Sequence, residues 1–381
     1  MLTIVNARAI LPSFVIDDAV IVIDRGKILF VGNKDEVSIP EDSEIYDARG
    51  NYVAPGFVDI HVHGGGNSLF YEDPIRAAEH FLSHGETTVL ATLYYDLGKE
   101  ALLDSVKKIK AAVELGIAPS IGGLYMEGPY MNPIYGASPE KNKWRGEIKI
   151  EDYRELVCEA GDFARVWAVA PEREGVKDFV KFVYSANPNV VISVGHSEAT
   201  PDQVFSLKEY GMSLQTHSMN ATGRVQTLKG TRSCGPDEAC ILDDSMYAEM
   251  ISDSLAIHVH PNMQRLLLKV KGMDKIVLIS DSFVSNEEPR PELRGVKDLS
   301  FDSNGDLSGS KLTLDIAIKN VIKHAGCELY EAVKMASLIP ARAVKLDGDI
   351  GSLEAGKRAN AVILSDELDV VKVMLDGKFV R

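Results

Sequence analysis

The sequence predicts an α/β protein, a TIM-like (β/α)8 barrel joined to a small β-sandwich domain that both chain ends build. Two observations predict this fold. The middle of the chain alternates short apolar runs with amphipathic stretches, which is typical of parallel strands joined by helical crossovers. Both ends instead read as consecutive strands separated by tight turns. We expect residues 1–53 and 347–381 to form the β domain, and residues 54–346 to form the barrel.

The first fifty residues are strand-like. Residues 19–23 and 27–31 are apolar runs, and Asp24-Arg25-Gly26 between them is a hairpin signal. Neither chain end is long enough for a comfortable core of its own, so we expect the two ends to pair and bring the termini together. The matching segments near the other end are 361–364, 370–375 and the turn at Asp376-Gly377.

Eight apolar runs, most of them followed by a helical stretch, fill the middle of the chain. Eight such units fit a closed barrel better than an open doubly wound sheet, and no Gly-x-Gly-x-x-Gly follows the first run. The runs are 57–63, 87–93, 121–127, 166–170, 190–196, 213–217, 247–252 and 276–281. The expected helices are 74–83, 99–113, 175–185, 201–209, 261–270, 314–323 and 329–338.

Composition excludes several classes of protein. Of 381 residues, 45% are hydrophobic and 25% charged, which is ordinary for a globular protein. The formal net charge is −15 and no dense Lys/Arg run offsets it, so we expect no nucleic-acid partner. No apolar run reaches the roughly 18 residues that suggest a bilayer span, and residues 1–23 lack a signal-peptide pattern. Without such a run, we expect no membrane partner. The four cysteines form no C-x-x-C pair, so we expect free thiols and a cytoplasmic location.

Ionisable residues gather at the ends of the apolar runs. His61 and His63 end the first run two residues apart, so both imidazoles lie on the same face of one strand. Strand C-termini form the rim on which barrel enzymes carry their active sites. One such residue alone more often only forms a hydrogen bond or caps a turn, but six at matching strand ends indicate a metal site. The other four residues are Glu127, His196, His217 and Asp281.

The residue types of this site suit a borderline divalent cation, because imidazole and carboxylate groups are the ligands that such ions take. We expect the metal to be zinc, with iron or manganese as alternatives, and the site to hold one or two ions. A second H-x-H, formed by His258 and His260, follows the seventh run, and we assign no carboxylate to it as a metal partner. One of these two histidines contacts the substrate, or both are structural; the sequence leaves both interpretations open.

Several motifs, in order along the whole chain, resemble a known family. The segment 55–64, PGFVDIHVHG, resembles the opening signature of the amidohydrolase superfamily. Tyr125-Met126-Glu127-Gly128-Pro129 is similar to the N-acetylglucosamine-6-phosphate deacetylases, as are Gly195-His196-Ser197 and Thr216-His217. The resemblance implies metal-dependent hydrolysis of N-acetylglucosamine 6-phosphate to glucosamine 6-phosphate and acetate, in amino-sugar catabolism.

We expect Asp281, placed beside the attacking water, to accept a proton from it and return this proton to the leaving amine. The resemblance implies roles for further residues. The residues that would hold the principal metal ion are Glu127, His196 and His217, with His61 and His63 available for a second ion. The residues that would bind the phosphorylated sugar are Asn220, the Ala221 backbone, His258 and Arg232. Because Arg232 corresponds to an arginine that a neighbouring subunit supplies, the resemblance implies a homodimer.

One departure lies where the substrate would bind. Ser138 stands where the family commonly has a histidine, and we expect this serine to contact the substrate. Departures of this kind keep open an amidohydrolase for another N-acetyl amino sugar, such as N-acetylgalactosamine 6-phosphate, or for another amide. A different class, a non-catalytic scaffold that kept the barrel, is also open, although it would be expected to lose metal ligands.

Overall fold

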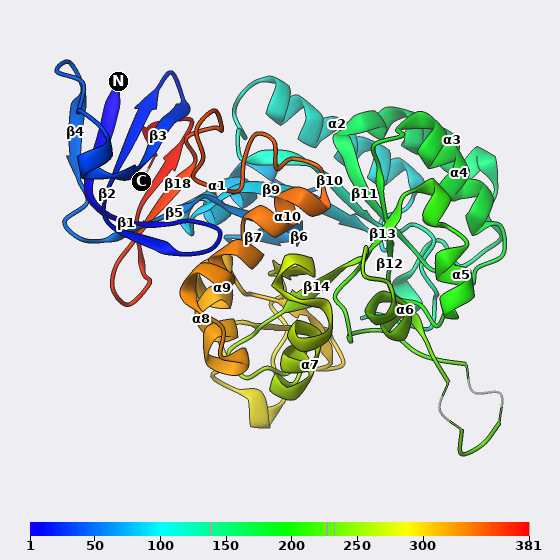
Figure 1. Ribbon diagram of the computed structural model, residues 1–381. Helices are drawn as coiled ribbons and strands as arrows, with labels where there is room; N and C mark the ends of the chain where they lie inside the picture. The colour runs from blue at the N-terminus through cyan, green and yellow to red at the C-terminus, as the bar shows by residue number, and fades with distance from the viewer. Residues whose placement is uncertain (138, 226–227, 232, 381) are drawn as a thin grey trace.

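The structure, a computed structural model, describes residues 1–137, 139–225, 228–231 and 233–380 and has a barrel of eight parallel strands at its centre (Figure 1). The strands pair in the order β15-β14-β13-β12-β11-β10-β9-β6. The Asp281 N–H donates to the His61 carbonyl at 3.0 Å, which joins the ends of the two outermost strands. The predicted barrel is confirmed. Its strands are β6 (Phe57–Val62), β9 (Glu86–Tyr94), β10 (Ile121–Glu127), β11 (Ala164–Val169), β12 (Val191–Val194), β13 (Met212–Gln215), β14 (Tyr247–Ile251) and β15 (Ile276–Ile279).

Helices cover the barrel and bury one face each, as α1 (Pro74–Ser83) shows with Ala77 and Phe81. Asp73 caps this helix by accepting a hydrogen bond from the Arg76 N–H at 3.1 Å. Within the described ranges, no helix is long and apolar enough to cross a bilayer. The other helices are α2 (Lys99–Glu114), α3 (Ile150–Ala160), α4 (Val176–Ala186), α5 (Pro201–Phe205), α6 (Pro236–Leu242), α7 (Pro261–Lys271), α8 (Leu314–Ala325), α9 (Leu329–Met335) and α10 (Leu338–Ala343).

The helix predicted over 329–338 is wrong as a single element, because the segment divides between α9 and α10. Pro340 has no N–H to donate, and in a continuous helix its ring would clash with the carbonyl of Ala336. The chain therefore starts a new helix at Leu338, with Pro340 in its first turn. Two helices, α3 and α6, were not predicted from the sequence.

Both chain ends meet in a second sheet beside the barrel, where the blue and red segments lie side by side (Figure 1). The C-terminal strand β18 pairs with β5, which places Ile363 opposite Val53. Side chains from both ends, among them Ile4, Ile21 and Ile363, form a core separate from that of the barrel. One continuous sheet thus builds the predicted domain. Its strands are β1 (Leu2–Ile10), β2 (Val15–Asp24), β3 (Lys27–Asn33), β4 (Glu44–Asp47), β5 (Tyr52–Pro55), β18 (Ala361–Leu364), β19 (Val370–Leu375) and β20 (Lys378–Phe379).

Two hairpin turns, one from each chain end, pack against each other in this sheet. Arg25 and Gly26 have φ values of 47° and 75°, and Asp376 and Gly377 have φ values of 50° and 75°. Such left-handed pairs are typical of two-residue hairpin turns. A Cβ atom on Gly26 would lie 3.1 Å from the Asp376 carbonyl oxygen, so this contact also favours glycine. The residues at which the two predicted domains divide stay a prediction.

Two short hairpins lie near the C-terminal rim of the barrel strands. The second one docks on the end of β15, because the Ser310 N–H donates to the Asp281 carbonyl at 2.8 Å. This contact makes the hairpin a wall of the cavity described below. The strands of the two hairpins are β7 (Gly64–Gly65) with β8 (Ser68–Leu69), and β16 (Leu299–Phe301) with β17 (Leu307–Ser310).

Candidate metal centre and active site

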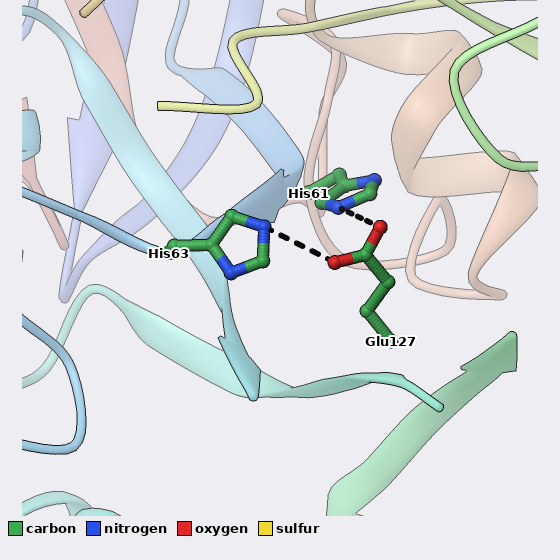
Figure 2. Close-up of side chains that lie close together, drawn as sticks. All are labelled: His61, His63 and Glu127. Atoms are coloured by element: carbon green, nitrogen blue, oxygen red, sulfur yellow. Dashed lines mark ion pairs between the residues drawn. The ribbon is translucent and has the colours of Figure 1, made fainter. Parts of the chain in front are cut away.

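Glu127, the last residue of β10, lies at the centre of a buried cluster of imidazoles. Its Oε1 atom is 2.8 Å from His196 Nε2 and 3.2 Å from His217 Nε2. On the other side, Glu127 Oε2 is 3.4 Å from His63 Nε2 and Oε1 is 3.7 Å from His61 Nε2 (Figure 2). The ligand atoms fall into two groups that share Glu127, and within each group they lie within 4.8 Å of one another.

The backbone adopts left-handed conformations where the strands end in this cluster. The φ values are 44° at His196, 26° at His217 and 48° at Asp281, and each of these residues lies two positions beyond its strand. A residue with a side chain adopts this conformation at a cost of about 1–2 kcal/mol. Strain of this kind tends to gather at functional sites, where the surrounding structure imposes it.

Asp281 faces the same cluster from the eighth barrel strand. Its Oδ1 atom is 3.3 Å from His63 Nε2 and 3.6 Å from His61 Nε2. Burial raises the pKa of the Asp281 carboxyl, but the imidazoles of His61 and His63 outweigh burial and hold this pKa below its ordinary value. Burial likewise opposes ionisation of Glu127, yet His196 and its neighbours hold the pKa of Glu127 well below its usual range. Both carboxyl groups are therefore anionic at neutral pH.

The donor set of this cluster fits a divalent cation. His61 Nε2 is buried and has no hydrogen-bond partner among the described residues. His196 Nε2 and His217 Nε2 lie 3.0 Å apart and face the same carboxylate oxygen. Nitrogen lone pairs that converge on a buried carboxylate without satisfying one another are the arrangement that a metal ion completes.

A cavity of about 430 Å³ opens from the cluster, and loops and strand ends of the rim form its walls. Asp96 stands in one wall, and its Oδ1 atom is buried with no hydrogen-bond partner in the described part of the chain. Burial raises the pKa of Asp96 to about 6. Further residues that line the cavity are Tyr94, Tyr95, Lys141, Phe283, Ser285, Glu287, Phe301 and Gly309.

Only some of the residues predicted to bind the substrate line the cavity. Asn220 and Ala221 line the cavity together with the metal cluster. His258 is not among the described residues that line the cavity. Its Nε2 atom lies 3.2 Å from the carbonyl oxygen of Gly309, and Gly309 lines the cavity. Ser138 and Arg232 lie outside the described residues.

Glu249 on β14 was not predicted as a site residue, and it is fully buried behind the cluster. Its Oε2 atom is 2.9 Å from His61 Nδ1 and accepts a hydrogen bond from the His217 N–H at 3.0 Å. A signal was present, since Glu249 is the one carboxylate inside the apolar run 247–252. The cavity residues Tyr94, Tyr95 and Asp96 were also missed, although they follow directly on the second apolar run.

The fold and the site define a class of protein, the barrel hydrolases that hold metal with histidine and carboxylate side chains at the C-terminal ends of the strands. The chain belongs to the amidohydrolase family, whose sequence model matches residues 52–380.

Individual relatives of the chain narrow this family. The chain is 27% identical over 351 residues to the N-acetylglucosamine-6-phosphate deacetylase of Haemophilus influenzae. This match covers 87% of each protein. It is 29% identical over 344 residues to the N-acetylgalactosamine-6-phosphate deacetylase of Escherichia coli O157:H7, which covers 86% of this chain and 87% of that protein. A mutant N-acetyl-D-glucosamine-6-phosphate deacetylase of Mycobacterium smegmatis, solved in complex with N-acetyl-D-glucosamine-6-phosphate, has a TM-score of 0.83 and 26% identity, covering 100% of this chain and 99% of that chain.

Proposed function

We propose that this protein hydrolyses the N-acetyl group of N-acetylglucosamine 6-phosphate to give glucosamine 6-phosphate and acetate. The observation that carries the proposal is the convergence of Glu127, His196 and His217 with Asp281 at the base of one cavity. Relatives that match 86–87% of the chain are named deacetylases of N-acetyl hexosamine 6-phosphates, which supports the same reaction here.

Glu127, His196 and His217 would hold the principal metal ion, and His61 and His63 with Glu127 would hold a second. We propose zinc, with iron or manganese as alternatives that the same ligand types accept. A divalent ion in this place supplies Lewis-acid polarisation of the amide carbonyl and lowers the pKa of a neighbouring water.

Asp281 would carry the proton through the reaction. Its side chain is 11% exposed and lines the cavity, so an attacking water can reach it. Asp281 accepts a proton as the water oxygen bonds to the amide carbon. The same proton then passes to the nitrogen as the C–N bond breaks, which lets the amino sugar leave as an amine and the acetyl group as acetate.

The phosphate would be bound by a few donors at close range. At a net charge of −15 the protein attracts no anion from a distance, so recognition rests on short charge-assisted hydrogen bonds. The proposed phosphate contacts are Asn220, the Ala221 backbone and Arg232, and Ser138 would contact the substrate. His258, whose Nε2 atom lies 3.2 Å from the Gly309 carbonyl oxygen, would act through the cavity wall rather than touch the phosphate. Since Arg232 would reach the phosphate from a neighbouring subunit, we also propose a homodimer.

We further propose that the protein works in the cytoplasm. Its four cysteines, Cys158, Cys234, Cys240 and Cys327, are all free thiols, which suits a reducing compartment.

A second candidate substrate is N-acetylgalactosamine 6-phosphate. The relative that is 29% identical is named for this epimer, and the chain is about as similar to it as to the N-acetylglucosamine-6-phosphate deacetylases. The two sugars differ only in the orientation of one hydroxyl group, so cavity walls rather than the metal cluster would separate them.

Acetate release from a panel of sugars tests the proposal. The panel is N-acetylglucosamine 6-phosphate, N-acetylgalactosamine 6-phosphate and the two unphosphorylated sugars, with metal content measured on the same sample. We expect the highest kcat/KM with N-acetylglucosamine 6-phosphate. A higher value with the galactose epimer would favour the second candidate, and acetate from no sugar by a metal-loaded protein would overturn the proposal.

A further inference from the structure

We infer that Glu249 is a positioning residue that fixes His61 as a metal ligand and ties it to the backbone of His217. Glu249 lies on β14, whereas His61 lies on β6 and His217 follows β13. One oxygen, Glu249 Oε2, reaches both partners, at 2.9 Å from His61 Nδ1 and 3.0 Å from the His217 nitrogen. A single carboxylate thus links the two ligand groups that share Glu127.

The contact with His61 selects its tautomer. Ligation through Nε2 requires the lone pair of that atom, so the single proton of a neutral imidazole must sit on Nδ1. Glu249 Oε2 is the acceptor for that proton. His61 Nε2 then faces the cluster, 3.7 Å from Glu127 Oε1 and 3.6 Å from Asp281 Oδ1.

Glu249 distinguishes His61 from the other imidazoles of the cluster. His63 Nδ1 and His196 Nδ1 are buried and have no hydrogen-bond partner among the described residues, and His217 Nδ1 faces only the Asn220 carbonyl at 3.1 Å. The His61 ring also stacks on Tyr125, with 4.4 Å between centroids and 21° between planes. The face of the His61 ring therefore packs on Tyr125, and its Nδ1 edge contacts Glu249.

The contact with His217 acts on the backbone. His217 has a φ of 26°, a conformation that needs support from its surroundings. The hydrogen bond from its N–H to Glu249 supplies such support directly at the strained residue. Loss of Glu249 should therefore weaken both ligand groups, whereas loss of His61 alone should weaken only one.

Zn²⁺ binding to the metal-free protein, measured by competition with a chromophoric chelator, tests this inference. A hydrogen-bonding partner behind a ligand typically contributes about 10- to 100-fold in metal affinity. We expect that loss in Glu249→Ala and a smaller loss in Glu249→Gln, whose amide oxygen still accepts both hydrogen bonds. Glu249→Gln also keeps the size of the side chain, so it decides the question if the alanine variant does not fold.

Glu86→Gln is the matched control, because Glu86 is a buried barrel glutamate that accepts a hydrogen bond from the Leu314 N–H at 2.8 Å. Wild-type Zn²⁺ affinity in folded Glu249 variants, or an equal loss in the Glu86 control, would overturn the inference. The inference rests on the metal site of the proposed function, but the measurement uses no substrate. If the Zn²⁺ affinity depends on Glu249 but the protein releases no acetate, only the proposed function is contradicted. If the protein is an active deacetylase and its Zn²⁺ affinity does not depend on Glu249, only the inference is contradicted.

Discussion

The cavity joins two sets of residues that the fold controls to different degrees. The strand-end set is buried and lies at or within two residues of the ends of barrel strands. The loop set is Lys141, Asn220, Ser285, Glu287 and residues 301–304 and 306–309, which line the same cavity from connecting segments and a hairpin. Barrel closure fixes where strands end but leaves loops free to vary. The strand-end set should therefore determine the reaction, and the loop set the substrate. The strand-end set is His61, His63, Glu127, His196, His217 and Asp281.

The largest effect should come from Asp281→Asn, in the strand-end set. Removing the group that accepts and returns the proton should lower kcat by about 10²- to 10⁴-fold. The metal content should stay at the wild-type value, because the proposed principal ligands are untouched. Steady-state acetate release with metal analysis on the same sample measures both quantities. Near wild-type turnover in a folded, metal-loaded variant would show that the proton carrier lies elsewhere.

A smaller effect should come from Asp253, which is fully buried and contacts His258, whose other ring nitrogen contacts Gly309 in the cavity wall. Burial raises the pKa of Asp253, but hydrogen bonds from His258 and from nearby backbone N–H groups outweigh burial and lower this pKa to about 2. A carboxyl group with a lowered pKa stabilises the fold above its unfolded pKa, near 4, and loses that contribution as the pH falls towards 2. The contribution is about 2 kcal/mol of unfolding free energy.

Asp253→Asn should remove this part of the acid sensitivity. Urea unfolding at pH 5, 4 and 3 measures it, and the free energy of unfolding of the variant should fall less steeply than that of the wild type. Parallel curves for the two proteins would contradict the assignment.

In the loop set, Asn220→Ala should raise KM for the phosphorylated sugar by about 10-fold, which is the effect of one hydrogen bond to a charged group. The value of kcat should change little, because Asn220 does not contact the reacting amide in this account. The unphosphorylated sugar serves as the control substrate and should show no change in kcat/KM. A loss of kcat with both sugars would place Asn220 in the reaction and blur the distinction between the two sets.

The smallest effect should come from outside the cavity. Arg358 and Asp376 form a two-point ion pair, at 2.6 and 2.7 Å, in the sheet built by the chain ends. Their side chains are 32% and 48% exposed, so Arg358→Ala should cost about 0.2–1 kcal/mol of unfolding free energy and leave kcat/KM unchanged. Thermal unfolding with the acetate assay measures both, and altered kcat/KM would connect this sheet to the site.

Much of the strand-end set could be predicted from the sequence, for physical reasons. His61 and His63 are two residues apart on a strand, so they share a face, and parallel strands bring their C-termini to one rim. The barrel itself follows from the alternation of apolar runs and helical stretches. The break after α9 could also be predicted, because Pro340 lies two residues beyond the predicted helix 329–338 and has no N–H to donate to the Ala336 carbonyl.

The remaining features depend on contacts between distant segments. The positive φ values of His196 and His217 have no local sequence signal, because they arise from how the strands meet. Glu249 contacts residues that are 188 and 32 positions away in the chain, so its role needs the folded structure. The loop set has no periodicity that a sequence pattern could detect. His258 faces Gly309 rather than the cavity because the hairpin that contains Gly309 docks beside it, and this contact is visible only in the folded structure.

Metal removal and replacement tests the central claim most directly. The protein is treated with a chelator, Zn²⁺ is added back in steps, and metal per chain and acetate release from N-acetylglucosamine 6-phosphate are measured on each sample. We predict that activity disappears with the metal and returns in proportion to the ion bound, with Glu127→Gln as a variant that neither rebinds the ion tightly nor recovers. Full acetate release by a protein shown to contain no metal would contradict the account.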